Sequence, residues 1–321
     1  MAPLMKIVSR DLFALTQADL PFREEFSRKL NRRKIQVRNV WFQEQPDGKV
    51  QYLAELRVKG KHCLPASEAA GVLSSMCKCP MTARASGKSL ITREYAVQRF
   101  VEEVNFKILF GAAKITKEKE NISGDNYVCT TEENGQFFMC LSDGMGSGLE
   151  ACRISESIVD TLEQLVDAGF TGETAARMVN SVMNIRNQEG RFSTVDIAAV
   201  DLYSGVCHFL KAGAATTFIK RDHWVEAISS TSPALGLVQQ AEFESSTKKL
   251  YEGDFLIMVT DGVLDALPQE DPEELMKEII LQVNAAAAQE LARGILERAL
   301  AYSGYHAADD MTVLAAGLWR K

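Results

Sequence analysis

The sequence contains no long apolar run. No window approaches the roughly 18–20 apolar residues that a helix needs to cross a bilayer, and the N-terminus shows no signal-peptide pattern. The seven cysteines are an odd number without a repeating spacing, which argues against a disulfide framework and is typical of a reduced cytosolic chain. We therefore expect a cytoplasmic protein with no membrane span in this chain.

Several common catalytic motifs are also missing. There is no Cys-x5-Arg loop, which excludes that class of cysteine phosphatase, and the glycine-rich stretches lack the Lys-Ser/Thr that completes a P-loop. Cys77 and Cys79 form a Cys-x-Cys pair without a second pair, so a zinc site there has little support. The histidines are scattered and have no metal-ligand spacing: His62, His208, His223 and His306.

Positive charge is scarce over most of the chain. The formal net charge is -7, which argues against general nucleic-acid binding. This average hides an asymmetry, because residues 1–112 carry 19 Lys+Arg against 11 Asp+Glu and the remainder carries 17 against 32. The asymmetry indicates two parts with different roles.

The first part, residues 1–103, is predicted to be a small α+β segment. Its first helix is expected to run from Thr16 to about Arg33, with Thr16 as the N-cap. Residues 35–44 and 49–59 alternate in polarity, and the turn-forming residues Pro46, Asp47 and Gly48 between them predict a hairpin. The remaining expected elements are a short helix at 65–77 and one or two strands at 95–116.

The second part, residues 104–321, shows recurring apolar strands with helices inserted in pairs. This order favours sheets that are covered by helices. The predicted helices are 148–168, 172–187, 271–283 and 286–302. The predicted strands are 126–130, 137–142, 195–202, 206–210, 216–219 and 254–260, followed by a last strand after residue 310.

Acidic residues recur at the ends of these strands, in "SGDNY", "LSDGMGSG", "FLIMVTDGV" and "ADDMTVLAAG". Desolvated carboxylates that converge repel one another unless a cation holds them, and Mg²⁺ and Mn²⁺ prefer oxygen ligands. Gly144 lets the backbone come close, so its carbonyl is a further candidate ligand. An Asp-Gly pair is also a common turn, and the spacing alone leaves both interpretations open. The acidic positions are Asp125, Asp143, Asp261, Asp309 and Asp310.

Seven motifs in order give the chain a family resemblance: "SGDN", "SDGMGSG", "STVDIAAVDL", "KAGAATTFIKR", "SPALGL", "GDFLIMVTDGV" and "DDMTV". The set resembles the PP2C-type (PPM) metal-dependent serine/threonine phosphatases, and more closely their bacterial branch that includes stage II sporulation protein E. The resemblance covers about residues 104–321, and residues 1–103 are more loosely similar to the end of a preceding regulatory segment. It implies an α+β fold, a PP2C-like αββα sandwich.

The resemblance also implies a set of site residues. Asp125 would reach two Mn²⁺ or Mg²⁺ ions directly or through water, Asp143 would bridge them, and Gly144 would lend its carbonyl. Asp261 and Asp309 would complete the set. Two such ions acidify a water and neutralise phosphoryl charge, so the four aspartates would act in catalysis through a metal-activated water.

The sequence departs from the family pattern at two positions. Met145 stands where eukaryotic members often have a histidine that helps protonate the leaving group. The arginine that grips phosphate in those members has no counterpart that we can place. Arg191 and Lys211 lie near motifs but are interpreted as structural, so the general acid and the phosphate clamp stay unassigned.

The resemblance implies that the substrate is a phosphorylated anti-sigma-factor antagonist, whose dephosphorylation frees a sporulation sigma factor. The related full-length proteins are membrane-anchored with this part in the cytoplasm, so the chain is expected to be a cytoplasmic piece of a longer protein. A homodimer through the N-terminal part is plausible in this branch. Helices 148–187 are expected to shift and complete the metal site, with Gly146 and Gly148 as the bend.

Three alternatives stay open at this point. The chain could be a regulatory binding module with an inactive site, although every expected acid is present. It could be a stress-response phosphatase of the same fold with another partner. It could also be a scaffold protein in which the aspartates are plain turns.

Overall fold

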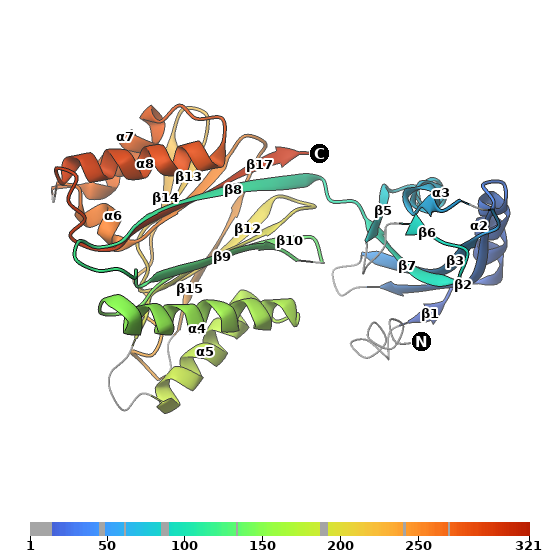
Figure 1. Cartoon of the computed structure of the whole chain (residues 1–321), viewed down its shortest axis with the longest axis horizontal. Helices are drawn as coiled ribbons and strands as arrows, with labels where there is room; N and C mark the ends of the chain where they lie inside the picture. The colour runs from blue at the N-terminus through green and yellow to red at the C-terminus, as the bar shows by residue number, and fades with distance from the viewer. Residues whose placement is uncertain are drawn as a thin grey trace. The chain divides into compact units, whose positions relative to one another are not determined.

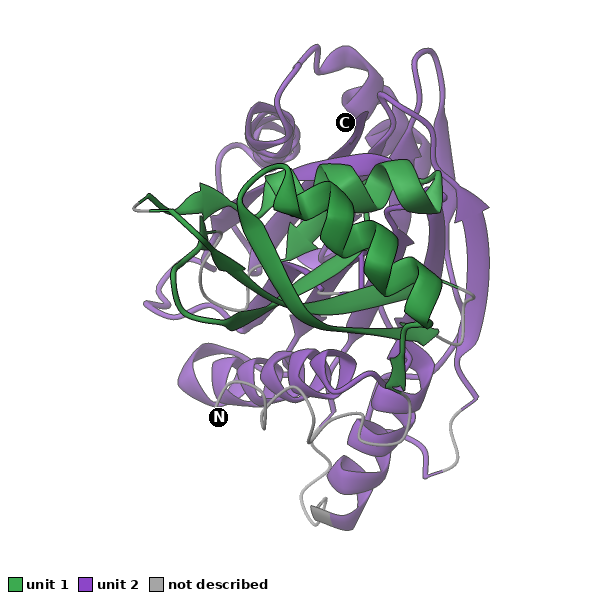
Figure 2. Cartoon of the chain, turned by 90° about the vertical axis from the view of Figure 1, so that its right-hand side faces the viewer, with its two compact units in different colours: residues 1–103 green, residues 104–321 purple. Residues whose placement is uncertain are grey.

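A computed structural model of the chain describes residues 15–44, 49–60, 62–84, 90–132, 134–186, 192–239, 242–268 and 270–321. The chain divides into two compact units, residues 1–103 and residues 104–321 (Figures 1 and 2). Among the described residues, no helix combines the length and apolar character that crossing a bilayer requires.

The first helix of the first unit begins later than the sequence predicts. Helix α2 (Leu20–Asn31) follows Asp19, whose carboxylate accepts a hydrogen bond from the Phe22 amide at 3.0 Å. Thr16 is therefore not the cap, and lies instead in strand β1 (Thr16–Gln17) opposite Phe42. The correction has a physical reason, because Asp is a strong N-cap and the proline that follows in the first turn has no amide to satisfy.

A five-stranded sheet forms the rest of the first unit, in the order β1-β2-β3-β7-β5. The predicted hairpin is confirmed by the antiparallel pairing of β2 and β3, while its turn residues Pro46, Asp47 and Gly48 lie outside the described residues. The elements of the unit are β2 (Ile35–Glu44), β3 (Val50–Val58), β4 (Leu64–Pro65), α3 (Ser67–Cys77), β5 (Met81–Arg84), β6 (Leu90–Ile91) and β7 (Ala96–Glu102).

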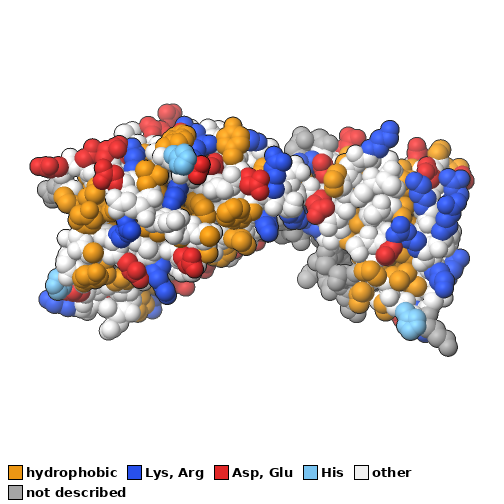
Figure 3. All heavy atoms as spheres, turned by 90° about the horizontal axis from the view of Figure 1, so that it is seen from above, with side chains coloured by type: hydrophobic (Ala, Val, Ile, Leu, Met, Phe, Trp, Pro, Cys, Tyr) orange, Lys and Arg blue, Asp and Glu red, His pale blue; other side chains and the backbone are white. Residues whose placement is uncertain are grey.

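Helices α2 and α3 supply apolar side chains to the core of this unit, where Phe26, Leu30, Leu73 and Phe100 are fully buried. The C-terminal turn of α2 leads into exposed basic residues, and Lys and Arg side chains gather on one side of the unit (Figure 3). The positive charge of the N-terminal part thus lies on its surface.

The second unit contains two antiparallel five-stranded sheets, in the orders β15-β12-β11-β10-β9 and β14-β13-β16-β17-β8. The first sheet consists of β9 (Asp125–Thr131), β10 (Gln136–Asp143), β11 (Val195–Asp201), β12 (Val206–Ala212) and β15 (Glu244–Lys249). The second consists of β8 (Phe106–Ile115), β13 (Thr217–Lys220), β14 (Val225–Ile228), β16 (Phe255–Val259) and β17 (Met311–Arg320).

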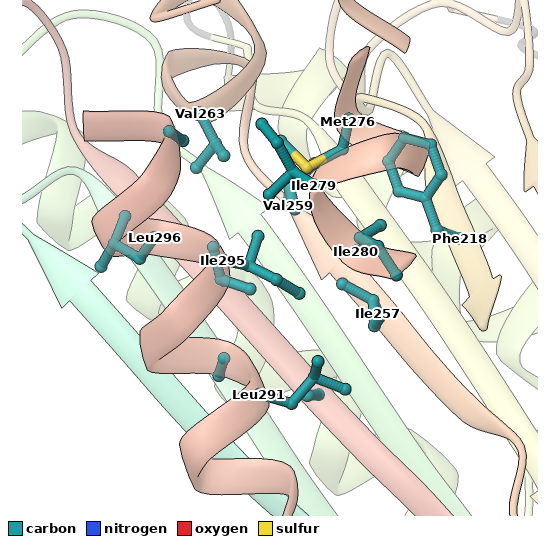
Figure 4. Packing of buried hydrophobic residues seen from close by; sticks show 14 of the residues in the cluster. Phe218, Ile257, Val259, Val263, Met276, Ile279, Ile280, Leu291, Ile295 and Leu296 are labelled. Carbon is teal, nitrogen blue, oxygen red and sulfur yellow. The ribbon is translucent and has the colours of Figure 1, made fainter. Parts of the chain in front are cut away.

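Helices cover the outer face of each sheet. Helices α4 (Gly148–Asp167) and α5 (Gly172–Arg186) pack on the first sheet. Helices α7 (Pro272–Gln282) and α8 (Ala288–Tyr302) pack on the second, where side chains such as Ile257, Ile280 and Ile295 interlock (Figure 4). The predicted αββα sandwich is confirmed.

Strand β10 shows why a central strand of this unit is apolar along almost its whole length. Phe137, Met139 and Leu141 point into the core between the two sheets, whereas Phe138 and Cys140 point into the core beneath α4 and α5. Both faces of the strand are covered, so alternation of polar and apolar residues disappears. Each buried Phe or Leu contributes roughly 1.5–3 kcal/mol relative to an exposed one.

Candidate metal centre

Two of the predicted site residues lie side by side at one end of the first sheet. Asp125 begins β9 and Asp143 ends β10, and the two are direct partners in the antiparallel register. Both positions mark the point where an apolar strand meets the edge of the sandwich. The pairing brings two carboxylates together although 17 residues separate them in the sequence.

The other two predicted acids come from the second sheet. Asp261 is the first residue of the short helix α6 (Asp261–Asp265), just after β16, and Asp309 precedes β17. Strands β16 and β17 are paired, so both acids leave the sheet at the same end. The carboxylates of Asp125, Asp261 and Asp309 all act on Asp143, and burial together with their repulsion raises its pKa to about 8.

Asp125 connects the two sheets. It is fully buried, and its Oδ2 accepts hydrogen bonds from the hydroxyl groups of Thr312 in β17 at 2.5 Å and of Thr260, directly after β16, at 3.2 Å. Burial raises its pKa to about 6, the Thr312 hydrogen bond opposes the rise, and the charge of Asp310 adds to it. The second oxygen, Oδ1, is buried and has no hydrogen-bond partner.

Asp310 has a different task from Asp309. Its two oxygens accept the backbone amides of Lys117 at 2.8 Å and Gly124 at 2.7 Å, and its side chain is buried. It therefore holds the loop that presents Asp125. The sequence gives no signal for this role, because the bonded amides lie more than 180 residues away.

Gly144 lies in close contact with the first turns of helix α4. A Cβ atom at this position would stand 2.1 Å from the carbonyl oxygen of Ala151 in the first turns of α4. Farther along the loop, Gly146 and Gly148 adopt φ angles of 103° and 70°, which favour glycine. The glycines thus let the chain turn from the site into the helix.

The donor set fits a hard divalent cation. Its candidate ligands are carboxylate oxygens and the Gly144 carbonyl, and the unpartnered Asp125 Oδ1 is a buried acceptor with no donor. In the described part of the chain, no group of three or more His, Cys, Asp or Glu side chains is by itself arranged to hold a metal ion. Mg²⁺ sites of this kind use one or two carboxylates per ion and keep several waters, so an incomplete protein shell agrees with the donor chemistry.

The basic residues near the site separate into different roles. Lys211 is fully buried in an ion pair with Asp196 at 2.5 Å, which leaves it unable to reach a substrate. Arg191 lies outside the described residues. Lys117, which sequence reasoning missed, has its Nζ 3.4 Å from Asp309 Oδ1 and remains about a third exposed. Lys117 is therefore a partly exposed cation beside one of the four predicted acids.

The sandwich of the second unit is that of PP2C phosphatase domains. A solved structure of the PP2C phosphatase domain and a fragment of the regulatory domain of SpoIIE from Bacillus subtilis superposes with a TM-score of 0.71. It covers 100% of this chain and 93% of the solved chain at 23% sequence identity, and the likeness establishes the fold.

The sequence places the chain within one family of this class. The model of the Stage II sporulation protein E (SpoIIE) family matches residues 133–318, so the chain belongs to that family. It is 32% identical to stage II sporulation protein E of Priestia megaterium over 209 residues, 65% of this chain and 36% of the relative. It is 27% identical to that of Bacillus subtilis over 246 residues, 76% of this chain and 30% of the relative. The chain thus spans about a third of the length of these relatives.

Proposed function

We propose that the chain is a protein serine/threonine phosphatase that uses two Mn²⁺ or Mg²⁺ ions. The observation that carries this proposal is the gathering of four aspartates from both sheets at one end of the sandwich. Burial and the charges of Asp125, Asp261 and Asp309 raise the pKa of Asp143, and carboxylates that repel in this way favour a cation at their centre. Membership of the SpoIIE family supports the same activity.

In this proposal Asp125, Asp143, Asp261 and Asp309, with the Gly144 carbonyl, hold the ions. Bound ions of this kind would supply an acidified water as nucleophile and would neutralise phosphoryl charge. Thr260 and Thr312 fix the orientation of Asp125, and Asp310 fixes its loop. Lys117 is available to orient a phosphoryl oxygen beside Asp309.

We propose a phosphorylated anti-sigma-factor antagonist as the substrate, and activation of a sporulation sigma factor as the outcome. The position of the aspartates supports a protein substrate, because they lie at strand ends on the rim of the sandwich. None of the four aspartates lines the apolar groove between α4 and α5, which has a volume of about 1110 Å³.

Residues 1–103 are proposed to regulate the phosphatase and to allow self-association. We propose that this regulation reaches the metal centre through movement of α4 and α5. Asn126 and Ser155 connect the Asp125 loop to α4 by hydrogen bonds, so a shift of the helix would move the loop.

A cytoplasmic location is supported by the seven free thiols, which are typical of a reducing compartment.

The proposal is tested by hydrolysis of a phosphoserine protein and of p-nitrophenyl phosphate with Mn²⁺, Mg²⁺ or EDTA. We expect turnover that depends on the ion and is lost, by at least about 100-fold, in Asp143→Asn and Asp261→Asn, because each variant removes a charged ligand. The matched control is Asp222→Asn, whose side chain is 91% exposed and pairs with His223 away from the site.

Three outcomes count against the proposal. Turnover that is unaffected by EDTA would exclude a metal-dependent phosphatase. A folded protein that binds Mn²⁺ without hydrolysing either substrate would identify a binding module with an inactive site. Absence of any rise in melting temperature with Mn²⁺ would favour a scaffold, because a bound ion stabilises the folded state by mass action.

A further inference from the structure

A layer of buried polar side chains separates the apolar core from the metal centre. In four strands, and directly after a fifth, the residue two positions from the inter-sheet core toward the site is polar and almost fully buried. These residues are Asp196, Lys211, Thr217, Thr260 and Thr312. Thr260 and Thr312 support Asp125, which leaves the remaining three without an assigned role.

Those three residues form one network. Asp196 on β11 and Lys211 on β12 are direct partners in the register and form an ion pair at 2.5 Å, with both side chains about 2% exposed. Thr217 on β13 of the second sheet donates its hydroxyl to the same oxygen, Asp196 Oδ2. The network therefore joins the two sheets and ties together both ends of the loop 213–216.

These contacts involve only one oxygen of the Asp196 carboxylate. Asp196 Oδ1 is buried and has no hydrogen-bond partner. A buried carboxylate oxygen without a donor is costly, and native proteins normally satisfy such groups with a protein or water donor. The atom therefore indicates a partner beyond the side chains of the network.

A small cavity lies beside Asp196. Its volume is about 20 Å³, and it is lined by Asp196, Thr194, Thr260 and Asp261 together with the loop residues 213–215. A cavity of roughly 10–15 Å³ or more with several polar partners has room for one water molecule. Water has two donors, so a single molecule can satisfy two carboxylates at once.

We infer that Asp196 is a positioning residue for Asp261, acting through one water in this cavity. The water donates to Asp196 Oδ1 and to the Asp261 carboxylate, and the ion pair with Lys211 holds the Asp196 side chain in place. Outer hydrogen bonds of this kind orient a ligating carboxylate and set its metal affinity. The inference rests on the proposed function, because it assigns Asp261 to the metal centre.

Direct Mn²⁺ binding tests the inference independently of hydrolysis. We expect Asp196→Asn to weaken Mn²⁺ binding about 10–100-fold, because the amide either replaces the acceptor Oδ1 with a donor or leaves there an oxygen without the carboxylate charge. Electron paramagnetic resonance of free Mn²⁺ measures the binding. The double variant Asp196→Asn with Lys211→Met leaves no unpaired buried charge, so it keeps the fold if the single variant does not. It should show the same loss.

The matched control is Thr217→Val, which removes a hydroxyl from the Oδ2 side of the same carboxylate and leaves the cavity side unchanged. We expect it to lower the melting temperature but to bind Mn²⁺ like the parent. Parent-like Mn²⁺ binding in a folded Asp196 variant would overturn the inference, as would an equal loss in Thr217→Val. A parent protein that binds Mn²⁺ but does not hydrolyse phosphoserine would refute only the proposed function.

Discussion

At the scale of single residues, the aspartate cluster makes the site sensitive to protons. Burial comes first among the causes that raise the pKa of Asp143 to about 8, followed by the charges of Asp125 and Asp261. Burial likewise raises the pKa of Asp125 to about 6. Without cations, the site thus retains a proton near neutral pH that an ordinary carboxyl would have released.

This leads to a prediction for the metal-free protein. An unfolded carboxyl titrates near 3.9, so between about pH 4 and 8 the folded state binds more protons than the unfolded state. Stability in EDTA should therefore fall as pH rises through this window. Melting temperatures at intervals from pH 5 to 8.5 measure the slope.

The same series has an internal control. Asp143→Asn should flatten the decline in EDTA, because the residue that takes up the proton is gone. Saturating Mn²⁺ should also oppose the decline, because a cation stabilises the ionised carboxylates of the folded state. A parent protein whose stability in EDTA rises steadily from pH 5 to 8 would contradict the repulsion described for this cluster.

The sequence predicts the acidic residues better than their supports. Asp125, Asp143 and Asp261 stand out because each adjoins an apolar strand and a turn. The different tasks of Asp309 and Asp310 are not visible there, because the amides that Asp310 accepts come from distant loops. Asp196 is hidden for the same reason, since its role depends on register across two sheets.

At the scale of elements, the junction between Gly144 and α4 controls the geometry of the site. The Asp143–Gly144 segment and the Asp125 loop both pack against the first turns of α4. We predict that Gly144→Ala displaces the start of α4, because the new Cβ would overlap the Ala151 carbonyl. Overpacking of this kind costs about 1–3 kcal/mol, which urea unfolding measures, and hydrolysis should fall with it.

A suitable control is Gly71→Ala in α3, where an added Cβ meets nothing within 4 Å. Alanine is the better helix former, so this variant should be neutral or more stable by up to about 1 kcal/mol. Equal stability and activity of Gly144→Ala and the parent would show that the close approach is unimportant.

Sequence patterns locate the long elements and miss the short ones. The paired helices of the second unit are found because their apolar residues repeat with a helical period. Strand β15 was not predicted, because "ESSTKK" is polar and lies at the edge of its sheet. The start of α2 was misplaced because Thr16 and Asp19 are both capping residues, and only the register of β1 with β2 distinguishes them.

At the scale of the whole molecule, the second unit has its own cores. Val104 and Phe106, which follow the boundary, are buried in the core between its two sheets. We predict that residues 104–321 alone fold cooperatively and retain Mn²⁺-dependent hydrolysis of p-nitrophenyl phosphate. Calorimetry and the hydrolysis assay on this piece check both statements, and a piece that is unfolded or inactive would contradict them.

The two-part organisation is visible in the sequence as a change in charge, from an excess of Lys and Arg before residue 112 to an excess of Asp and Glu after it. The sandwich architecture follows from the order of seven motifs, confirmed by the family match. The inter-sheet contacts are not predictable from the chain alone, because they depend on how ten strands pair.

The hydroxyl groups of Thr260 and Thr312 hold Asp125 across the sandwich, and this has a consequence for reading related chains. A related chain that had lost its activity would still need these three side chains to keep its two sheets aligned. Their retention is therefore uninformative about turnover. Substitution of Asp261 or Asp309, which have no comparable structural role, would be the earlier sign that a related chain has lost its activity.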